Sequence, residues 1–197
     1  MTRLVVLASG SGTNLQAILD ACGDGRLPAE VAAVVSNRSG SRALQRAADA
    51  GVPYVHVAPH TGEPRPDYDA RLADIVSGFD PDWVVLAGWM RVLSMSFLGW
   101  FPGMVVNLHP ALPGELPGVD SIARAWHEAQ QGRRQHTGVM VHLVPDEGVD
   151  NGPVLASAIV SIHPADTLES LTERVHGVEH RLLVETLTTL CTTGANA

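Results

Sequence analysis

The segment Met104–Pro110 holds the residues whose types and spacing are best suited to chemistry. It is apolar except for Asn107 and His109, which stand at its carboxyl end. Alternate side chains of a strand point to one side, so we expect the Asn107 amide and the His109 imidazole to project together. Pro110 favours an extended His109. An amide donor beside a titratable imidazole suits an oxygen that gains negative charge in a transition state, and the alternative is a pair with only structural hydrogen bonds.

An acidic turn, Asp146–Pro153, lies between two further apolar runs. Gly152 and Pro153 favour a chain reversal there. A carboxylate of this turn could meet His109 across a crevice, where its charge would keep the imidazole protonated and oriented. Taken alone, however, an acidic turn is usually a solvated loop, so both interpretations stay open.

A loop of small residues, Ser9–Asn14, follows the first apolar run and precedes an amphipathic stretch. Glycines let a ligand approach the backbone, and the unpaired N–H groups at a helix start attract phosphate. The loop lacks the third glycine of a dinucleotide fingerprint, because Leu15 follows Asn14, and Ser36–Arg38 stands where an acid would bind ribose. No Gly-Lys-Ser/Thr motif for ATP is present. The loop predicts a phosphate site, and the alternative is a tight turn with no ligand.

The pattern along the chain predicts a single α/β domain over residues 1–197. Apolar runs typical of strands buried on both faces alternate with amphipathic stretches, as in an open sheet with right-handed crossovers. We expect strands at Leu4–Ala8, Val31–Val35, Pro53–Val57, Trp83–Ala87, Met104–Leu108, Val139–Val144 and Val154–Val160. We expect helices at Thr13–Cys22, Ser41–Ala50, Asp67–Ser77, Ser121–Gln131 and, as a long last helix, from about Thr167 to Leu190.

Composition argues against several classes of protein. The formal net charge of −8 disfavours nucleic acid as a partner. No apolar run approaches the ~20 residues of a membrane span, and the two cysteines form no disulfide framework, so we expect a cytoplasmic protein with no membrane partner. We expect no metal site, because five of the 9 histidines are scattered and suited to structural roles: His56, His60, His136, His142 and His163.

Together these segments resemble the glycinamide ribonucleotide transformylases, folate-dependent enzymes of purine synthesis. The resemblance covers nearly the whole chain, and its motifs keep their order and spacing: Ser9–Leu15, Gly88–Leu93, Asn107–Pro110, Thr137–His142 and Asp150–Pro153. It implies a Rossmann-like, open and mostly parallel sheet with helices on both faces. It also implies formyl transfer from 10-formyltetrahydrofolate, the cosubstrate, to the amine of glycinamide ribonucleotide, with no metal. We expect a monomer or a homodimer.

The resemblance assigns roles to individual positions. It implies a catalytic trio of Asn107, His109 and Asp150. It implies that the ribonucleotide is bound by Gly12, Thr13, Asn14 and Glu179. The folate would be contacted by Arg65, Met90, Arg91, Val92, Leu93 and Asn107.

The sequence departs from the common family pattern beside the trio. The loop Pro110–Gly118 has lost a leucine and carries Glu115 in place of a neutral or basic residue. A histidine found in many members is missing near Asp120, and the stretch Glu128–Gln135 is a few residues longer than usual. We therefore expect the backbone around the site to differ from that of other members.

Four alternative functions remain open at this point. A methionyl-tRNA formyltransferase would carry a further RNA-binding domain and a less acidic chain. A formyltetrahydrofolate hydrolase would pass the formyl group to water and usually has an added regulatory domain. A non-enzymatic nucleotide-binding module would not need the trio. A sugar-amine formyltransferase of the same superfamily is the hardest of these to separate.

Overall fold

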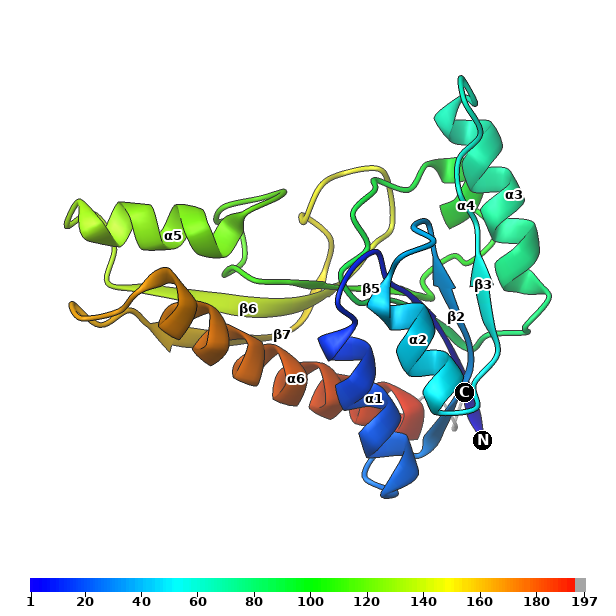
Figure 1. Cartoon of the computed structure of the whole chain (residues 1–197), viewed down its shortest axis with the longest axis horizontal. Helices are drawn as coiled ribbons and strands as arrows, with labels where there is room; N and C mark the ends of the chain where they lie inside the picture. The colour runs from blue at the N-terminus through cyan, green and yellow to red at the C-terminus, as the bar shows by residue number, and fades with distance from the viewer. Residues whose placement is uncertain (194–197) are drawn as a thin grey trace.

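The computed structural model describes residues 1–193, in which seven strands form one sheet with helices packed against it (Figure 1). The strands lie in the order β3-β2-β1-β4-β5-β6-β7. Their bounds are β1 Thr2–Leu7, β2 Ala29–Ser36, β3 Tyr54–His56, β4 Trp83–Leu86, β5 Val105–His109, β6 His136–Leu143 and β7 Val154–Ser161. The helices are α1 Thr13–Gly23, α2 Arg42–Asp49, α3 Arg65–Ser77, α4 Met95–Leu98, α5 Ser121–Gln130 and α6 Leu168–Thr193.

Strand direction confirms the predicted α/β class. Strands β1 to β5 pair in parallel, whereas β6 and β7 are antiparallel to their neighbours. The order of the parallel strands reverses between β1 and β4. Strands β2 and β3 lie on one side of β1, whereas β4 and β5 lie on its other side. In open α/β sheets, ligands bind at the carboxyl ends of the strands beside such a reversal.

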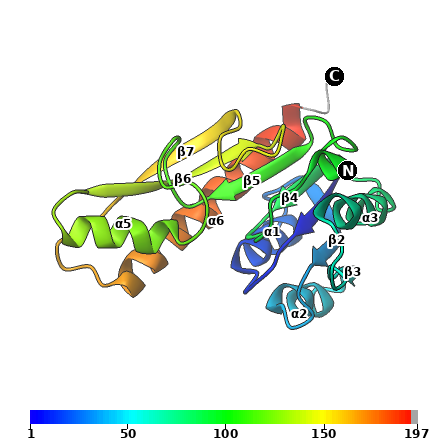
Figure 2. The same ribbon diagram turned by 90° about the horizontal axis from the view of Figure 1, so that it is seen from above.

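Helices cover both faces of the sheet, and α5 and α6 lie along its β6–β7 end (Figure 2). One apolar core lies between the sheet and α1, α2, α5 and α6, where Ile18 and Leu183 are fully buried. The other core contains α3 and α4, with Tyr68 and Phe97 fully buried. Successive residues of β1 alternate between the two cores. Burial of each such side chain contributes roughly 1.5–3 kcal/mol.

Three segments meet at the carboxyl edge of the central strands. The N–H of Ser9, in the loop after β1, donates to the carbonyl oxygen of Gly88, in the loop after β4, at 3.0 Å. Leu86 at the end of β4 pairs with Asn107 of β5. The sheet register thus brings the small-residue loop, the Gly88–Leu93 segment and the end of β5 to one place.

A few element bounds differ from the sequence expectations. Helix α3 begins at Arg65 rather than Asp67, because proline is favourable at a helix start and one stands there. Strand β6 begins three residues earlier than expected. The four-residue helix α4 was not predicted, because it is too short to show a helical period. In the part of the chain that the structure describes, no helix has the length and apolarity that crossing a bilayer requires.

Candidate active site

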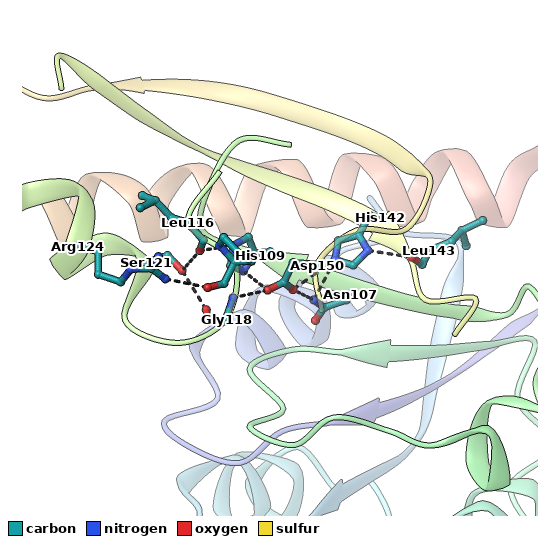
Figure 3. A network of polar contacts seen from close by, with 10 residues as sticks. Asn107, His109, Leu116, Gly118, Ser121, Arg124, His142, Leu143 and Asp150 are labelled. Carbon is teal, nitrogen blue, oxygen red and sulfur yellow. Dashed lines mark hydrogen bonds and ion pairs between the residues drawn. The ribbon is translucent and has the colours of Figure 1, made fainter. Parts of the chain in front are cut away.

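Asn107 and His109 meet Asp150, which is distant from them in sequence, at the carboxyl end of β5 (Figure 3). Asn107 and His109 extend from β5, and Asp150 from the turn between β6 and β7. Nδ1 of His109 lies 3.2 Å from Oδ2 of Asp150. The Asn107 amide donates to Oδ1 of the same carboxylate at 3.1 Å. The structure therefore brings the three predicted residues into direct contact.

Hydrogen bonds define where His109 carries protons. Nε2 lies 3.2 Å from the carbonyl oxygen of Leu116, which can only accept, so Nε2 is protonated. Nδ1 faces the Asp150 carboxylate, so the geometry favours an imidazolium. Burial, the larger effect, holds the pKa of His109 below its ordinary value, and the charge of Asp150 acts in the opposite direction, as expected, and offsets part of this.

Asp150 is held as a carboxylate by its neighbours. Burial opposes its ionisation, but the nearby His142 ring, a hydrogen bond from the Gly118 N–H and the charge of His109 together hold the pKa of Asp150 below its ordinary value. The Gly118 N–H donates to Oδ2 at 2.8 Å. The backbone φ of Asp150 is +52°, a left-handed value that non-glycine residues adopt only where the surroundings hold them. The turn is thus built to present this carboxylate.

The trio lines a cavity of about 810 Å³, a volume within the range of small-molecule sites, ~300–1,000 Å³. The segment after β4 forms one wall, on which all four predicted folate residues of that segment lie: Met90, Arg91, Val92 and Leu93. The Met90 N–H donates to the hydroxyl of Ser9 at 2.9 Å, which fixes this wall to the loop after β1. The Arg91 guanidinium lies 4.7 Å from the centre of the Tyr68 ring.

The predicted ribonucleotide residues lie beside this cavity and do not line it. Gly12 precedes α1 with a φ of +69°, and Thr13 and Asn14 form the first residues of the helix. Glu179 of α6 is only 5% exposed. Burial raises the pKa of Glu179 to about 7, against the effect of a hydrogen bond from Asn14. The structure therefore places Asn14 and Glu179 together, next to the small-residue loop.

Comparison with known proteins decides the family. The Formyl transferase family matches residues 2–187 of the chain. The chain belongs to this family.

Relatives of this formyl transferase match it along most of their length. Phosphoribosylglycinamide formyltransferase of Schizosaccharomyces pombe is 43% identical, over 95% of this chain and 96% of that protein. The Escherichia coli protein of the same name is 38% identical, over 91% of this chain and 82% of that protein. The crystal structure of phosphoribosylglycinamide formyltransferase from Bacillus halodurans superimposes with a TM-score of 0.89 at 38% identity, over 96% and 95% of the two chains. The predicted family and fold are confirmed.

His142 is a residue of this formyl transferase site that sequence analysis missed. It is buried, and its Nδ1 lies 2.8 Å from the carbonyl oxygen of Leu143, so Nδ1 carries a proton. Its Nε2 lies 3.1 Å from the Asn107 amide nitrogen and 3.6 Å from Oδ1 of Asp150. His142 stands opposite Asn107 in the antiparallel β5–β6 pair. The strand register is the feature that would have indicated His142. This register does not follow from the spacing of histidines along the chain.

Arg65, a predicted folate residue, is not among the residues that line the cavity, and it is already paired. It forms an ion pair with Glu147 of the Asp150 turn, and the two side chains are 40% and 41% exposed. The other carboxylate oxygen of Glu147 accepts the Met95 N–H at 3.1 Å. The sequence pattern assigns Glu147 no role. Among residues 1–193, no group of three or more His, Cys, Asp or Glu side chains is arranged to hold a metal ion.

Proposed function

We propose that this formyl transferase moves the formyl group of 10-formyltetrahydrofolate to the amine of glycinamide ribonucleotide, giving formylglycinamide ribonucleotide and tetrahydrofolate. One observation carries the proposal. Asn107, His109 and Asp150 contact one another on the lining of a cavity of about 810 Å³. The chain around them is 43% identical to a phosphoribosylglycinamide formyltransferase over nearly its whole length.

The chemistry needs donors for an oxygen that gains charge. The substrate amine attacks the formyl carbon, and the formyl oxygen becomes an oxyanion in the tetrahedral intermediate. The Asn107 amide and protonated His109 stabilise it with hydrogen bonds, and loss of one such donor typically costs ~10²–10³-fold in rate. In the structure both donors are engaged, Asn107 with Asp150 and His109 with the Leu116 carbonyl. The formyl oxygen therefore replaces an acceptor that belongs to the protein.

Asp150 maintains the protonated imidazole during this step. Its carboxylate faces Nδ1 of His109 and opposes the effect of burial on the pKa of His109. As the carbon–nitrogen bond forms and the bond to the folate nitrogen breaks, the attacking amine loses one proton and N10 of the folate gains one. We assign this transfer to a water beside Asp150.

The folate subsite is proposed on the wall formed by Gly88–Leu93. This wall follows the buried strand β4, and its side chains are apolar except for Arg91, which stacks on Tyr68. A flat pterin suits such a slot. Arg65 would face the glutamate tail at the rim. Its planar guanidinium has five N–H donors, so it can contact a ligand carboxylate while one nitrogen stays with Glu147.

The ribonucleotide phosphate is proposed to bind at Gly12, Thr13 and Asn14, with Glu179 contacting the same substrate. This is supported by the left-handed Gly12 and by the helix start that follows it. The test compares glycinamide ribonucleotide with its dephosphorylated riboside. Phosphate held by several N–H groups contributes ~1.5–3 kcal/mol per charge-assisted bond, so kcat/KM should fall at least ~10²-fold for the riboside. Equal reaction of both substrates would remove the phosphate site.

A Gly12 variant would test the phosphate site less cleanly than the comparison of the two substrates. A Cβ at Gly12 would lie 2.8 Å from the Cα of Ala43, and the positive φ disfavours any side chain. Gly12→Val would therefore distort the contact between the loop and α2 as well as block the phosphate. The riboside leaves the protein unchanged, and an unaltered KM for 10-formyltetrahydrofolate would show that the penalty is confined to the acceptor.

A further inference from the structure

The loop Pro110–Gly118 supplies two backbone partners of the trio. The Leu116 carbonyl oxygen lies 3.2 Å from Nε2 of His109, and the Gly118 N–H donates to Asp150 at 2.8 Å. Leu116 has a φ of +45°, which a leucine adopts only where its surroundings hold it. The position of this loop therefore affects the alignment of both His109 and Asp150.

Arg134 holds this loop from outside. Its guanidinium forms ion pairs with Glu115, which directly precedes Leu116, and with Glu128 near the end of α5, where Nε lies 2.8 Å from the carboxylate. It also donates to the carbonyl oxygen of His136 at 3.3 Å. The Arg134 side chain is 15% exposed, so water screens these charges less than at an open surface.

The two ends of the loop are supported differently. Ser121 and Arg124 hold its later part, because their side chains donate to the carbonyl oxygens of Leu116 and Pro117 at 3.1 and 2.7 Å. Pro113–Glu115 and Pro117 line a second cavity of about 300 Å³ together with the Asp150 turn. In the earlier part, the side-chain support is the ion pair of Glu115 with Arg134.

We propose that Arg134 is a positioning residue, which through Glu115 sets the Leu116 carbonyl and the Gly118 N–H that align the trio. The proposal rests on the proposed formyl transfer. When the formyl oxygen takes the hydrogen bond of His109, the Leu116 carbonyl oxygen keeps only its contact with Ser121, and the loop depends more on Arg134. Glu115 and the stretch Glu128–Gln135, which we expect to differ from the common family pattern, then act together to position the loop.

The test combines turnover with amide hydrogen exchange in the full chain. Arg134→Gln removes the charge, and Glu115→Gln breaks the same ion pair while Arg134 keeps its contact with Glu128. Each should lower kcat about 10-fold with both KM values within about threefold, because a ~1 Å misplacement of reacting groups can cost up to ~10²-fold. The double variant should be little worse than either single variant. Exchange of the Gly118 amide should rise at least about fivefold in each.

Arg3→Gln is the matched control. Arg3 also pairs with a carboxylate, that of Glu30 at 2.5 Å, and donates to backbone carbonyl oxygens. It lies near the amino end of β1, whereas the candidate site lies at the carboxyl ends of the strands. It should leave kcat and Gly118 exchange unchanged. The proposal is overturned if Arg134→Gln and Glu115→Gln keep kcat within twofold, if their effects multiply, or if exchange rises equally at Gly118 and at a core amide such as Val6. Exchange reports on the loop even if the wild-type chain transfers no formyl group, so failure of the proposed function would be seen separately.

Discussion

Replacing Asp150 by asparagine should lower turnover by at least ~10²-fold while the protein stays folded. The amide has the size of the carboxylate and can still accept the Gly118 N–H, which donates to Asp150 at 2.8 Å. It carries no charge, however, and so cannot stabilise an imidazolium at His109. The change therefore isolates the electrostatic role of Asp150 from its role in shaping the turn.

The expected magnitude follows from the distance between the two groups. Nδ1 of His109 and Oδ2 of Asp150 are 3.2 Å apart. Opposite charges at ~4 Å interact by about 4 kcal/mol at an effective dielectric constant of ~20. Loss of this attraction lowers the pKa of His109 further and reduces its protonated fraction, and a loss of about 2.7 kcal/mol corresponds to ~10²-fold in rate. Burial, which already lowers the pKa of His109, would then act unopposed by its main counter-charge.

Steady-state release of tetrahydrofolate, measured across a range of pH, is the assay. Because protonated His109 is the active form, kcat/KM should decline as pH rises through its pKa, and in Asp150→Asn this decline should move to lower pH. The deficit should therefore shrink as the pH is lowered. Asp49→Asn, an exposed carboxylate on α2 bonded only to Gln45, is the control and should behave as wild type. Near-wild-type turnover, or a deficit that is the same at every pH, would refute this reasoning.

Three further outcomes follow from the same structure. Asn107→Ala and His109→Ala should each be severe, and the double variant little worse than the poorer single one, because both donors serve one oxygen; fully multiplicative losses would contradict this. Arg65→Ala should raise the KM for 10-formyltetrahydrofolate only a few-fold and leave kcat within twofold. The Arg65 side chain is 40% exposed, and an exposed ion pair contributes roughly 0–1 kcal/mol. A large fall in kcat would instead place Arg65 at the reacting groups. Arg174→Gln should lower the free energy of unfolding by about 1–2 kcal/mol at neutral pH. Arg174 holds the pKa of Asp166 well below its ordinary value, so this difference should be full above pH ~4 and disappear at lower pH as Asp166 is protonated, which denaturant titrations at several pH values would measure.

Local patterns in the sequence were sufficient to predict the main architecture and part of the site. Buried parallel strands have continuous apolar runs, so β1, β2, β4 and β5 were predicted close to their observed places. The alternation of a strand placed Asn107 and His109 on one side. Asp150 needed more, because an acidic turn is ordinary by itself, and only the resemblance to a family singled it out.

The remaining features depend on contacts that spacing along the chain does not encode. His142 joins the site through the antiparallel register of β6 with β5. The Leu116 carbonyl is a backbone group, so no residue type marks it. The net direction of the pKa shift of His109 depends on how deeply the ring is buried, which the sequence pattern does not specify. The pair of Arg65 with Glu147 likewise joins the start of α3 to a turn that is distant in sequence.

The central claim, formyl transfer to glycinamide ribonucleotide, is tested most directly by one measurement. The purified chain is incubated with 10-formyltetrahydrofolate, and release of tetrahydrofolate is followed with and without glycinamide ribonucleotide, with formate measured in parallel. Release of tetrahydrofolate should depend on the ribonucleotide, should equal the amount of formylglycinamide ribonucleotide formed, and should give no formate. Equal release without the ribonucleotide, with formate as the product, would show a hydrolase instead of a transferase.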